Sequence, residues 1–201
     1  GHHGVAMSAT CCVEATVTAT VAQLRAVLAF ADDDPSRSIS RVCLEPSHGR
    51  IIATDGHALV VVGRDVEAPD APDTARWLVF ATDVIAALRG RKPGAAVTLH
   101  CTEDSVVAEC DGTTAVIARD RAEYPPVRSV VPSWAPAETP AGRWRIDTRY
   151  LAKIDVLARA TCAHKEWPLG VEIRTPGDVL SPVRFDLPDR KGMVVVMPMR
   201  L

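Results

Sequence analysis

The order of predicted elements repeats along this chain of 201 residues. A strand, a helix and three further strands are predicted three times, at intervals of about 60 residues, and such a period indicates one supersecondary unit used repeatedly. Helices separated by runs of short strands with turn residues between them are typical of α+β proteins. We therefore expect three β-α-β-β-β units, with antiparallel sheets and with the helices on one face.

The first unit has clear boundaries. Apolar residues at helical spacing predict a helix from 21 to about 31, and Thr20 is a suitable N-cap for it. The sequences Ser47-His48-Gly49 and Asp55-Gly56 are turn signals between strands. The predicted strands of this unit are 15–20, 39–45, 50–54 and 58–63.

The second unit follows a proline-rich crossover at 67–74. We expect Thr82 to cap its helix, which is predicted from 83 to about 91. Val84, Ile85 and Leu88 are expected to face the core, because their spacing places them on one side of a helix. The dipeptide Asp111-Gly112 predicts a hairpin turn. The predicted strands are 77–80, 96–101, 105–110 and 114–119.

The third unit carries the most regular amphipathic helix. Asp147 or Thr148 is expected to cap it, and it is predicted to end near residue 160. Its expected apolar side consists of Leu151, Ile154, Leu157 and Ala158. The predicted strands are 144–146, 169–174, 182–187 and 192–197.

These units divide the chain into domains. Residues 1–13 are expected to be a tag remnant and a flexible N-terminus. Residues 14–132 are expected to form a complete domain of two units. A proline-rich linker at 133–142 then leads to a half domain at 143–201, which ends in a C-terminal tail.

Composition excludes several classes of function. A net charge of −2 argues against a protein whose whole surface grips nucleic acid, although one face can still be basic. Six cysteines without a C-x-x-C motif favour neither a disulfide scaffold nor a zinc site. No apolar run approaches the ~20 residues that span a bilayer. We expect a cytoplasmic protein with no membrane association, no metal and no cofactor.

The sequence also gives no sign of catalysis. Its histidines are scattered, and no serine or cysteine has an obvious general base beside it. The acidic run Asp32-Asp33-Asp34 follows a predicted helix and precedes a proline, so we interpret it as a solvated loop. No glycine-rich phosphate-binding motif is present. We therefore expect no catalytic residue and a non-enzymatic protein.

Lysine and arginine gather on the predicted helices, and two interpretations are open. These side chains can simply solvate the outer faces of amphipathic helices. Alternatively, the helices can line a surface that follows DNA phosphates without reading sequence, by contacts that weaken as salt rises. The candidate DNA-facing residues are Arg25, Arg89, Arg91, Lys92, Arg149, Lys153 and Arg159.

Three separated segments carry a resemblance to one known family. Residues 51–59 read Ile-Ile-Ala-Thr-Asp-Gly-His-Ala-Leu, residues 124–132 read Tyr-Pro-Pro-Val-Arg-Ser-Val-Val-Pro, and the chain ends in Met-Pro-Met-Arg-Leu after an apolar run. In this order they resemble the partner-pocket segments of the bacterial sliding clamp, the β subunit of DNA polymerase III. Ala58 and Ser129 stand where the family usually has arginine, so partner preference is expected to differ.

The resemblance implies a hydrophobic pocket for short peptides of DNA polymerases and of the clamp loader. Methionines suit a surface that accepts varied partners, while leucine, valine and proline form a concave apolar wall. Carried over position by position, the pocket residues are Ile39, Thr54, Gly56, His57, Leu59, Pro125, Val130, Val195, Met197, Pro198, Met199 and Arg200.

The same resemblance implies a processivity factor that encircles or tracks double-stranded DNA without sequence preference. The chain matches the family's middle domain and the second half of its last domain, with the usual first domain absent. Four chains of three units would supply the twelve units of a ring, so a homotetramer is one expectation. A reduced clamp that does not form a ring, and that regulates partners through the same pocket, is the alternative.

Overall fold

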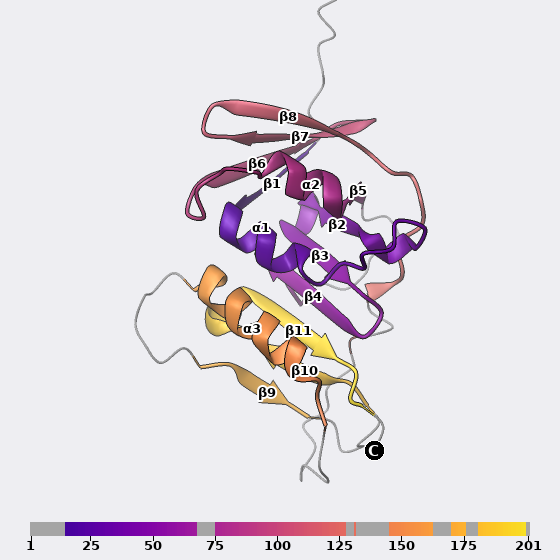
Figure 1. Ribbon diagram of the computed structural model, residues 1–201, viewed down its shortest axis with the longest axis vertical. Coiled ribbons are helices and arrows are strands. Elements are labelled where there is room, and N and C mark those ends of the chain that lie inside the picture. The colour runs from indigo at the N-terminus through magenta and orange to yellow at the C-terminus, as the bar shows by residue number, and fades with distance from the viewer. Residues whose placement is uncertain are drawn as a thin grey trace, which may run out of the picture.

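The computed structural model describes residues 15–67, 75–127, 131, 145–162, 170–175 and 181–199. These residues form an α+β structure in which every strand pairing is antiparallel (Figure 1). In these ranges, no helix combines the length and the apolar character that crossing a bilayer requires. The elements in chain order are β1 Ala15–Thr20, α1 Val21–Leu28, β2 Arg41–Glu45, β3 Arg50–Thr54, β4 Ala58–Gly63, β5 Trp77–Phe80, α2 Ala81–Ala87, β6 Ala96–Cys101, β7 Ser105–Cys110, β8 Thr113–Ala118, α3 Thr148–Thr161, β9 Glu172–Arg174, β10 Val183–Asp186 and β11 Gly192–Val196.

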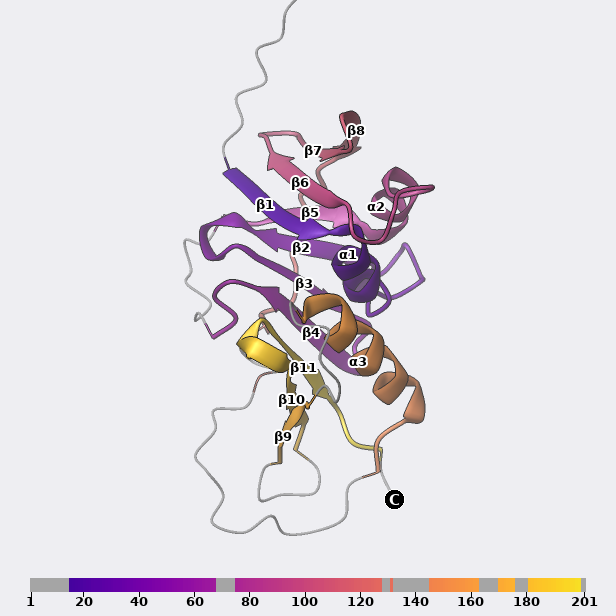
Figure 2. The same ribbon diagram turned by 90° about the vertical axis from the view of Figure 1, so that its left-hand side faces the viewer.

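The strands form two sheets. The four-stranded sheet has the order β1-β6-β7-β8, and the seven-stranded sheet has the order β5-β2-β3-β4-β11-β10-β9. The first two helix-and-strand groups exchange their first strands, because β1 pairs with β6 whereas β5 pairs with β2. Strand β11 pairs with β4, so the C-terminal strands extend the sheet of the N-terminal part. The three helices lie in a row on one side of the molecule (Figure 2).

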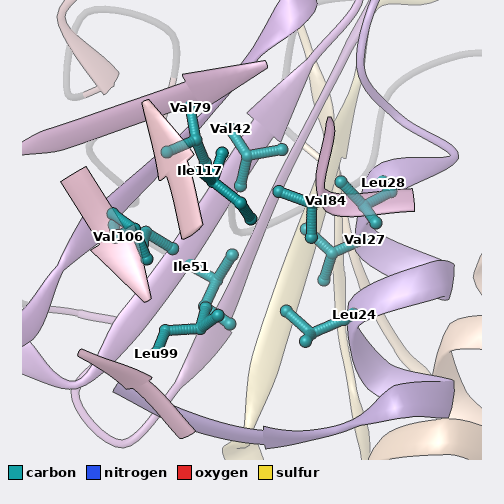
Figure 3. A pocket seen from close by; sticks show the side chains of 11 residues that line it. Leu24, Val27, Leu28, Val42, Ile51, Val79, Val84, Leu99, Val106 and Ile117 are labelled. Carbon is teal, nitrogen blue, oxygen red and sulfur yellow. The ribbon is translucent and has the colours of Figure 1, made fainter. Parts of the chain in front are cut away.

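The main core lies between the two sheets and the helices. Side chains of α1 and α2 meet side chains from both sheets there, and the space between them is too small for a water molecule (Figure 3). Close packing of this kind contributes most of the favourable free energy of folding. The residues around this space are Leu24, Val27, Leu28, Val42, Leu44, Ile51, Val79, Val84, Leu99, Val106 and Ile117.

A second apolar cluster covers the opposite face of the seven-stranded sheet. Side chains alternate between the faces of a strand, so Val60 points to the main core while Leu59 joins the second cluster. The segment that contains Tyr124 and Val127 packs over this cluster. Its buried members are Cys43, Ile52, Leu59, Val61, Val66, Leu78, Tyr124, Val127, Met193 and Val195.

Charged pairs flank this second cluster. Glu45 is fully buried and pairs with Arg50 and Arg76. Arg184 on β10 pairs with Asp186 and with Glu67 of the crossover. The hydrogen bonds that Arg184 donates lower the pKa of the Glu67 carboxyl. The Glu67 pair therefore ties the crossover to the C-terminal strands by charge as well as by packing.

Three details of the first two helices differ from the sequence expectation. Helix α1 begins as predicted, with a capping box between Thr20 and Gln23, but it ends at Leu28. Helix α2 begins at Ala81 with Phe80 as its N-cap, so the expected Thr82 cap is wrong. Ile85 is 49% exposed rather than in the core. Strand β5 runs directly into α2, and this junction sets the start of the helix and the direction of its faces.

The third helix group differs more. Asp147, one of the two residues expected to cap α3, is its N-cap and accepts a hydrogen bond from the Arg149 backbone N–H. Tyr150 is buried, whereas Leu151 is 44% exposed, so the expected apolar side is displaced by one residue. Residues 145–147 form no strand, although 144–146 were predicted to. Within the described ranges these residues have no neighbouring strand that could pair with them.

Some expectations lie outside the described residues. These are the N-terminal segment 1–13 and the linker 133–142. Part of the predicted crossover, at 68–74, and the first residue of two predicted strands, Trp144 and Leu169, lie outside them too.

Candidate functional site

The turn between β3 and β4 is held by its own side chains. The Asp55 Oδ1 atom accepts from the backbone N–H groups of His57, at 3.0 Å, and Ala58, at 2.9 Å. The Thr54 hydroxyl donates to the Ala58 carbonyl at 2.7 Å and accepts from the Gly56 N–H. Gly56 has a φ of 88°, which a residue with a side chain rarely adopts. These local bonds leave the His57 side chain exposed at the end of strands β3 and β4.

The tail after β11 runs beside this turn. The Met197 N–H donates to the His57 carbonyl at 2.9 Å, and the Met199 N–H donates to the Arg145 carbonyl at 2.8 Å. These two backbone bonds order the tail without burying its methionines. Met197 is 42% exposed and Met199 is 49% exposed. Two flexible apolar side chains are thus presented to solvent next to His57.

The remaining apolar members of the expected pocket lie around the same turn. A Cβ atom added to Gly56 would stand 3.5 Å from the Ile39 Cδ1 atom. Leu59 and Val195 face each other across the β4–β11 pair and belong to the cluster beneath Tyr124 and Val127. Pro125, between those two residues, is half-buried.

The structure therefore brings together most of the residues carried over by resemblance. Thr54, Gly56, His57 and Met197 adjoin one another through hydrogen bonds of the backbone and of the Thr54 hydroxyl, while Leu59 and Val195 are buried in the cluster next to them. Pro198 is half-buried between the two exposed methionines. Val130 and Arg200 lie outside the described residues.

Comparison with known proteins adds a result on the fold. No family model and no curated protein matches the chain, but 183 chains of solved structures do. The DNA polymerase III β subunit of Thermotoga maritima covers 93% of this chain with a TM-score of 0.65. This chain has the sliding-clamp fold. The β subunit of Borrelia burgdorferi gives the same TM-score over 92% of the chain, and the sliding clamp of Pseudomonas aeruginosa gives 0.61 over 93%.

The likeness to these clamps is one of fold rather than of sequence. The three sequences are 16%, 11% and 15% identical to this one, in the order given above. The chain spans 64–66% of the length of these clamp chains. The fold predicted from the sequence is confirmed. The prediction that the chain corresponds to only part of a clamp is confirmed as well.

Several of the candidate DNA-facing residues are paired. Arg25 lies on α1, Arg149, Lys153 and Arg159 lie on α3, and Arg89, Arg91 and Lys92 follow the end of α2. Arg149 binds Asp147, and Arg159 lies 3.0 Å from Asp155. The Arg149 hydrogen bonds lower the pKa of the half-buried Asp147 carboxyl. Arg25 donates to the carbonyl groups of Leu88 and Arg91 at the end of α2. These contacts reduce the positive charge that the row of helices presents to a ligand.

The other cations of this set differ among themselves. Arg89 and Lys92 are exposed, and with the described residues neither side chain forms an ion pair. Arg91 is half-buried. Lys153 is drawn inward, because its ammonium lies 3.8 Å from Asp55 and over the rings of Phe30 and Tyr150. Arg89 and Lys92 are therefore the most available cations of this set.

Sequence reasoning missed the second role of Asp55. Its Oδ1 atom holds the turn, while its Oδ2 atom accepts a 2.9 Å hydrogen bond from the Tyr150 hydroxyl. Asp55 thereby connects the turn beside the tail to α3. Only the turn was recognisable from the sequence, because the two partners of this bond are 95 residues apart in the chain.

A separate recess of about 420 Å³ lies at the other end of the Tyr124 segment. Three arginines and two carboxylates line it, and the arginines Arg76 and Arg121 already pair with Glu45 and Asp104. The recess is therefore close to neutral and distinct from the surface around His57 and Met197. Its residues are Arg76, Leu78, Arg119, Asp120, Arg121, Ala122, Glu123, Tyr124 and Pro126.

Proposed function

We propose that this chain is a non-catalytic, sliding-clamp-like accessory protein of DNA replication in the cytoplasm. Its helix face holds double-stranded DNA through sequence-independent contacts, so that a polymerase stays on its template. The surface around His57, Met197 and Met199, next to the buried Leu59, binds short hydrophobic peptides of the polymerase and of the clamp loader.

One observation carries the peptide-binding part of this proposal. Met197 is fixed to the His57 turn and Met199 to Arg145, each by a backbone hydrogen bond, yet both residues stay close to half exposed. Exposed methionines on an ordered backbone are costly to leave in water, and they can adapt their shape to different apolar partners. A surface of this kind suits peptide binding better than it suits a role in core packing.

A direct binding measurement tests this part. A fluorescein-labelled decapeptide that ends in two bulky apolar residues is titrated with the full chain, and a peptide with serine at both positions serves as the ligand control. We expect Met199→Ala and His57→Ala each to weaken binding by about tenfold, as substitutions at the centre of an interface commonly do. Val116→Ala, at an exposed site on β8, is the matched control and leaves binding unchanged. Equal binding by all variants would contradict the proposed surface.

The second candidate function is a reduced clamp that binds the same peptides without enclosing DNA. The pairing of Arg149 with Asp147 and of Arg159 with Asp155 favours it, because paired cations contribute little to phosphate binding. Such a protein would compete with a complete clamp for its partners.

Retention on circular DNA separates the two candidates. A chain that encloses DNA stays on a closed circle and is lost when a restriction enzyme linearises the circle. A chain that only touches phosphates binds both forms equally and is removed by salt. Retention on the circle supports the processivity factor, whereas peptide binding without any DNA retention supports the reduced clamp.

A further inference from the structure

The C-terminal helix-and-strand group leaves a core-facing surface open. Ile173 on β9 is paired across the sheet with Phe185, which is 3% exposed and belongs to the main core. Residues opposite each other in antiparallel strands point to the same face, so Ile173 also points to the core side. It is nevertheless 59% exposed. On the second strands of the other two groups, Val42 of β2 is only 2% exposed and Val97 of β6 is fully buried.

Helix α3 has an open flank on the same side. Residues two positions apart on a helix point in nearly opposite directions, because each residue advances by about 100°. Lys153 reaches Phe30 at the end of α1, so the flank that carries Leu151 faces away from α1. Leu151 is 44% exposed. Leu151 and Ile173 together mark an apolar surface that the described part of the chain does not cover.

The first two groups show how such a surface is closed within this chain. The residue before each helix is its N-cap, and the strand that ends at the N-cap pairs with the second strand of the other group. Thr20 pairs with Ala96, the first residue of β6, and Phe80 pairs with Arg41, the first residue of β2. One position earlier, Ala19 faces Val97 and Val79 faces Val42, so both pairings place apolar residues opposite each other.

Residues 145–147 stand in the same place relative to α3. Asp147 is the N-cap and is extended, like Thr20 and Phe80. In β5, the carbonyl two residues before the N-cap, that of Leu78, accepts from Asp120 just beyond β8. In the C-terminal group, the carbonyl two residues before the N-cap, that of Arg145, accepts from Met199 just beyond β11. One edge of this segment is thus satisfied as in β5.

The other edge of residues 145–147 corresponds to the edge of β5 that pairs with β2. For residues 145–147, that edge has no strand partner in the described ranges, and β9 has only β10. Exposed strand edges readily pair with another chain. A chain that carries both an open first strand and an open second strand can satisfy both by pairing with its own copy about a twofold axis.

We propose that a second copy of this chain covers the surface, with residues 145–147 of each copy pairing with β9 of the other. Ile146 of one copy then faces Ile173 of its partner, as Val79 faces Val42, and the two Leu151 flanks meet between the α3 helices. In this antiparallel register Arg145 lies directly opposite Arg174 of the other copy and Asp147 lies directly opposite Glu172. Opposite charges therefore meet only along the diagonals, between Arg145 and Glu172 and between Asp147 and Arg174. This self-association is independent of peptide binding.

The molar mass in solution tests this proposal on the full chain, through the micromolar range. We expect the wild type to have twice the chain mass of 21.6 kDa. Ile173→Glu should reduce it to one chain, and the exposure of Ile173 means that the monomer still folds. Val116→Glu, on the edge strand β8 where the side chain is 74% exposed, is the matched control and should stay paired. A wild type of one chain, or an Ile173→Glu variant that stays paired, overturns the proposal.

Crosslinking locates the contact without changing its charge. An Ile146→Cys chain is mixed with an Ile173→Cys chain under mild oxidation, and the digest is searched by mass spectrometry for the peptide that joins position 146 to position 173. We expect that peptide in the mixture. A mixture of Ile146→Cys with Val116→Cys serves as the control and should give no joined peptide. If the wild type is a dimer but the mixture of the two variants gives no 146–173 peptide, the proposed register is overturned.

Discussion

The Tyr150 hydroxyl donates a 2.9 Å hydrogen bond to the Asp55 carboxylate, and this bond joins α3 to the turn between β3 and β4. The other oxygen of the same carboxylate accepts from two backbone N–H groups of the turn. Next to the ordered tail, this one side chain therefore adds a link between the N-terminal part of the chain and its C-terminal group, which also join through the β4–β11 pairing. The geometry of the candidate peptide surface depends on this contact.

Loss of the Tyr150 hydroxyl should weaken that junction. Tyr150→Phe removes a half-buried hydrogen bond to a charged acceptor, so we expect the free energy of unfolding to fall by about 1–2 kcal/mol. Asp55→Ala should cost more, because it also removes the bonds that hold the turn. Urea unfolding of the two single variants and of the double variant measures the coupling between the residues. Additive effects of the two changes would contradict a direct interaction.

The two tyrosines of the chain should resist ionisation while the protein is folded. Burial raises the pKa of Tyr150 above its ordinary value of 10.0, and the hydrogen bond to Asp55 adds to this. Burial also raises the pKa of Tyr124. The folded state then holds protons that the unfolded state releases, so the stability present below pH 10.0 is lost as the pH rises above it.

An alkaline titration checks this expectation. Phenolate absorbance should appear only together with the loss of the circular dichroism signal of the folded chain, and Tyr150→Phe should halve the absorbance change. A tyrosine that titrates near its ordinary pKa in the folded protein would show that its hydroxyl is open to water.

Gly63 should tolerate no side chain. A Cβ atom there would lie 2.2 Å from the Gly49 carbonyl oxygen and 2.6 Å from the Arg50 Cα atom, and both neighbours are backbone. We expect Gly63→Ala to lower the free energy of unfolding by about 3 kcal/mol or more, measured by urea unfolding. Gly112→Ala is the matched control, since its φ is also positive but its surroundings are open. It should cost only about 1 kcal/mol, and equal losses would contradict the steric argument.

Local signals in the sequence predicted local structure well. Asp111 and Gly112 have φ values of 50° and 71° and close the hairpin between Cys110 and Thr113, as a two-residue turn requires. Thr20 caps α1 through its own hydroxyl. Each of these outcomes depends on residues within a few positions of one another, so the sequence contains the information directly.

Burial on the short helices was harder to predict, because it depends on neighbours that the helix does not encode. Ile85 and Leu151 have the spacing of core residues, yet both are exposed, since no described element packs on those flanks. The burial of Tyr150 was missed for the same reason. Its partner Asp55 is remote in sequence, where the local pattern indicates only a turn residue. The three segments of the candidate site were placed together by resemblance to a family rather than by any pattern within each segment.

DNA binding, if the helix row provides it, should depend on the cations that form no ion pair with the described residues. Arg89 and Lys92 are exposed, whereas Arg149 and Arg159 are each held by an aspartate. We expect Arg89→Ala with Lys92→Ala to weaken binding to duplex DNA and to reduce the slope of log K against log salt by about 2, since each phosphate contact contributes about 0.9. Fluorescence anisotropy over a series of salt concentrations measures both quantities.

The paired cations supply the control for this prediction. Arg149→Ala with Arg159→Ala removes the same formal charge, but it also frees Asp147 and Asp155, whose carboxylates then repel phosphate. If the arginines are bound mainly to these aspartates, their loss should change the salt slope by less than 1, because few counterion-releasing contacts disappear. An equal change in slope for both double variants would mean that the aspartates release their arginines to DNA. The row of helices would then act as one continuous basic surface, as a clamp that slides on DNA requires.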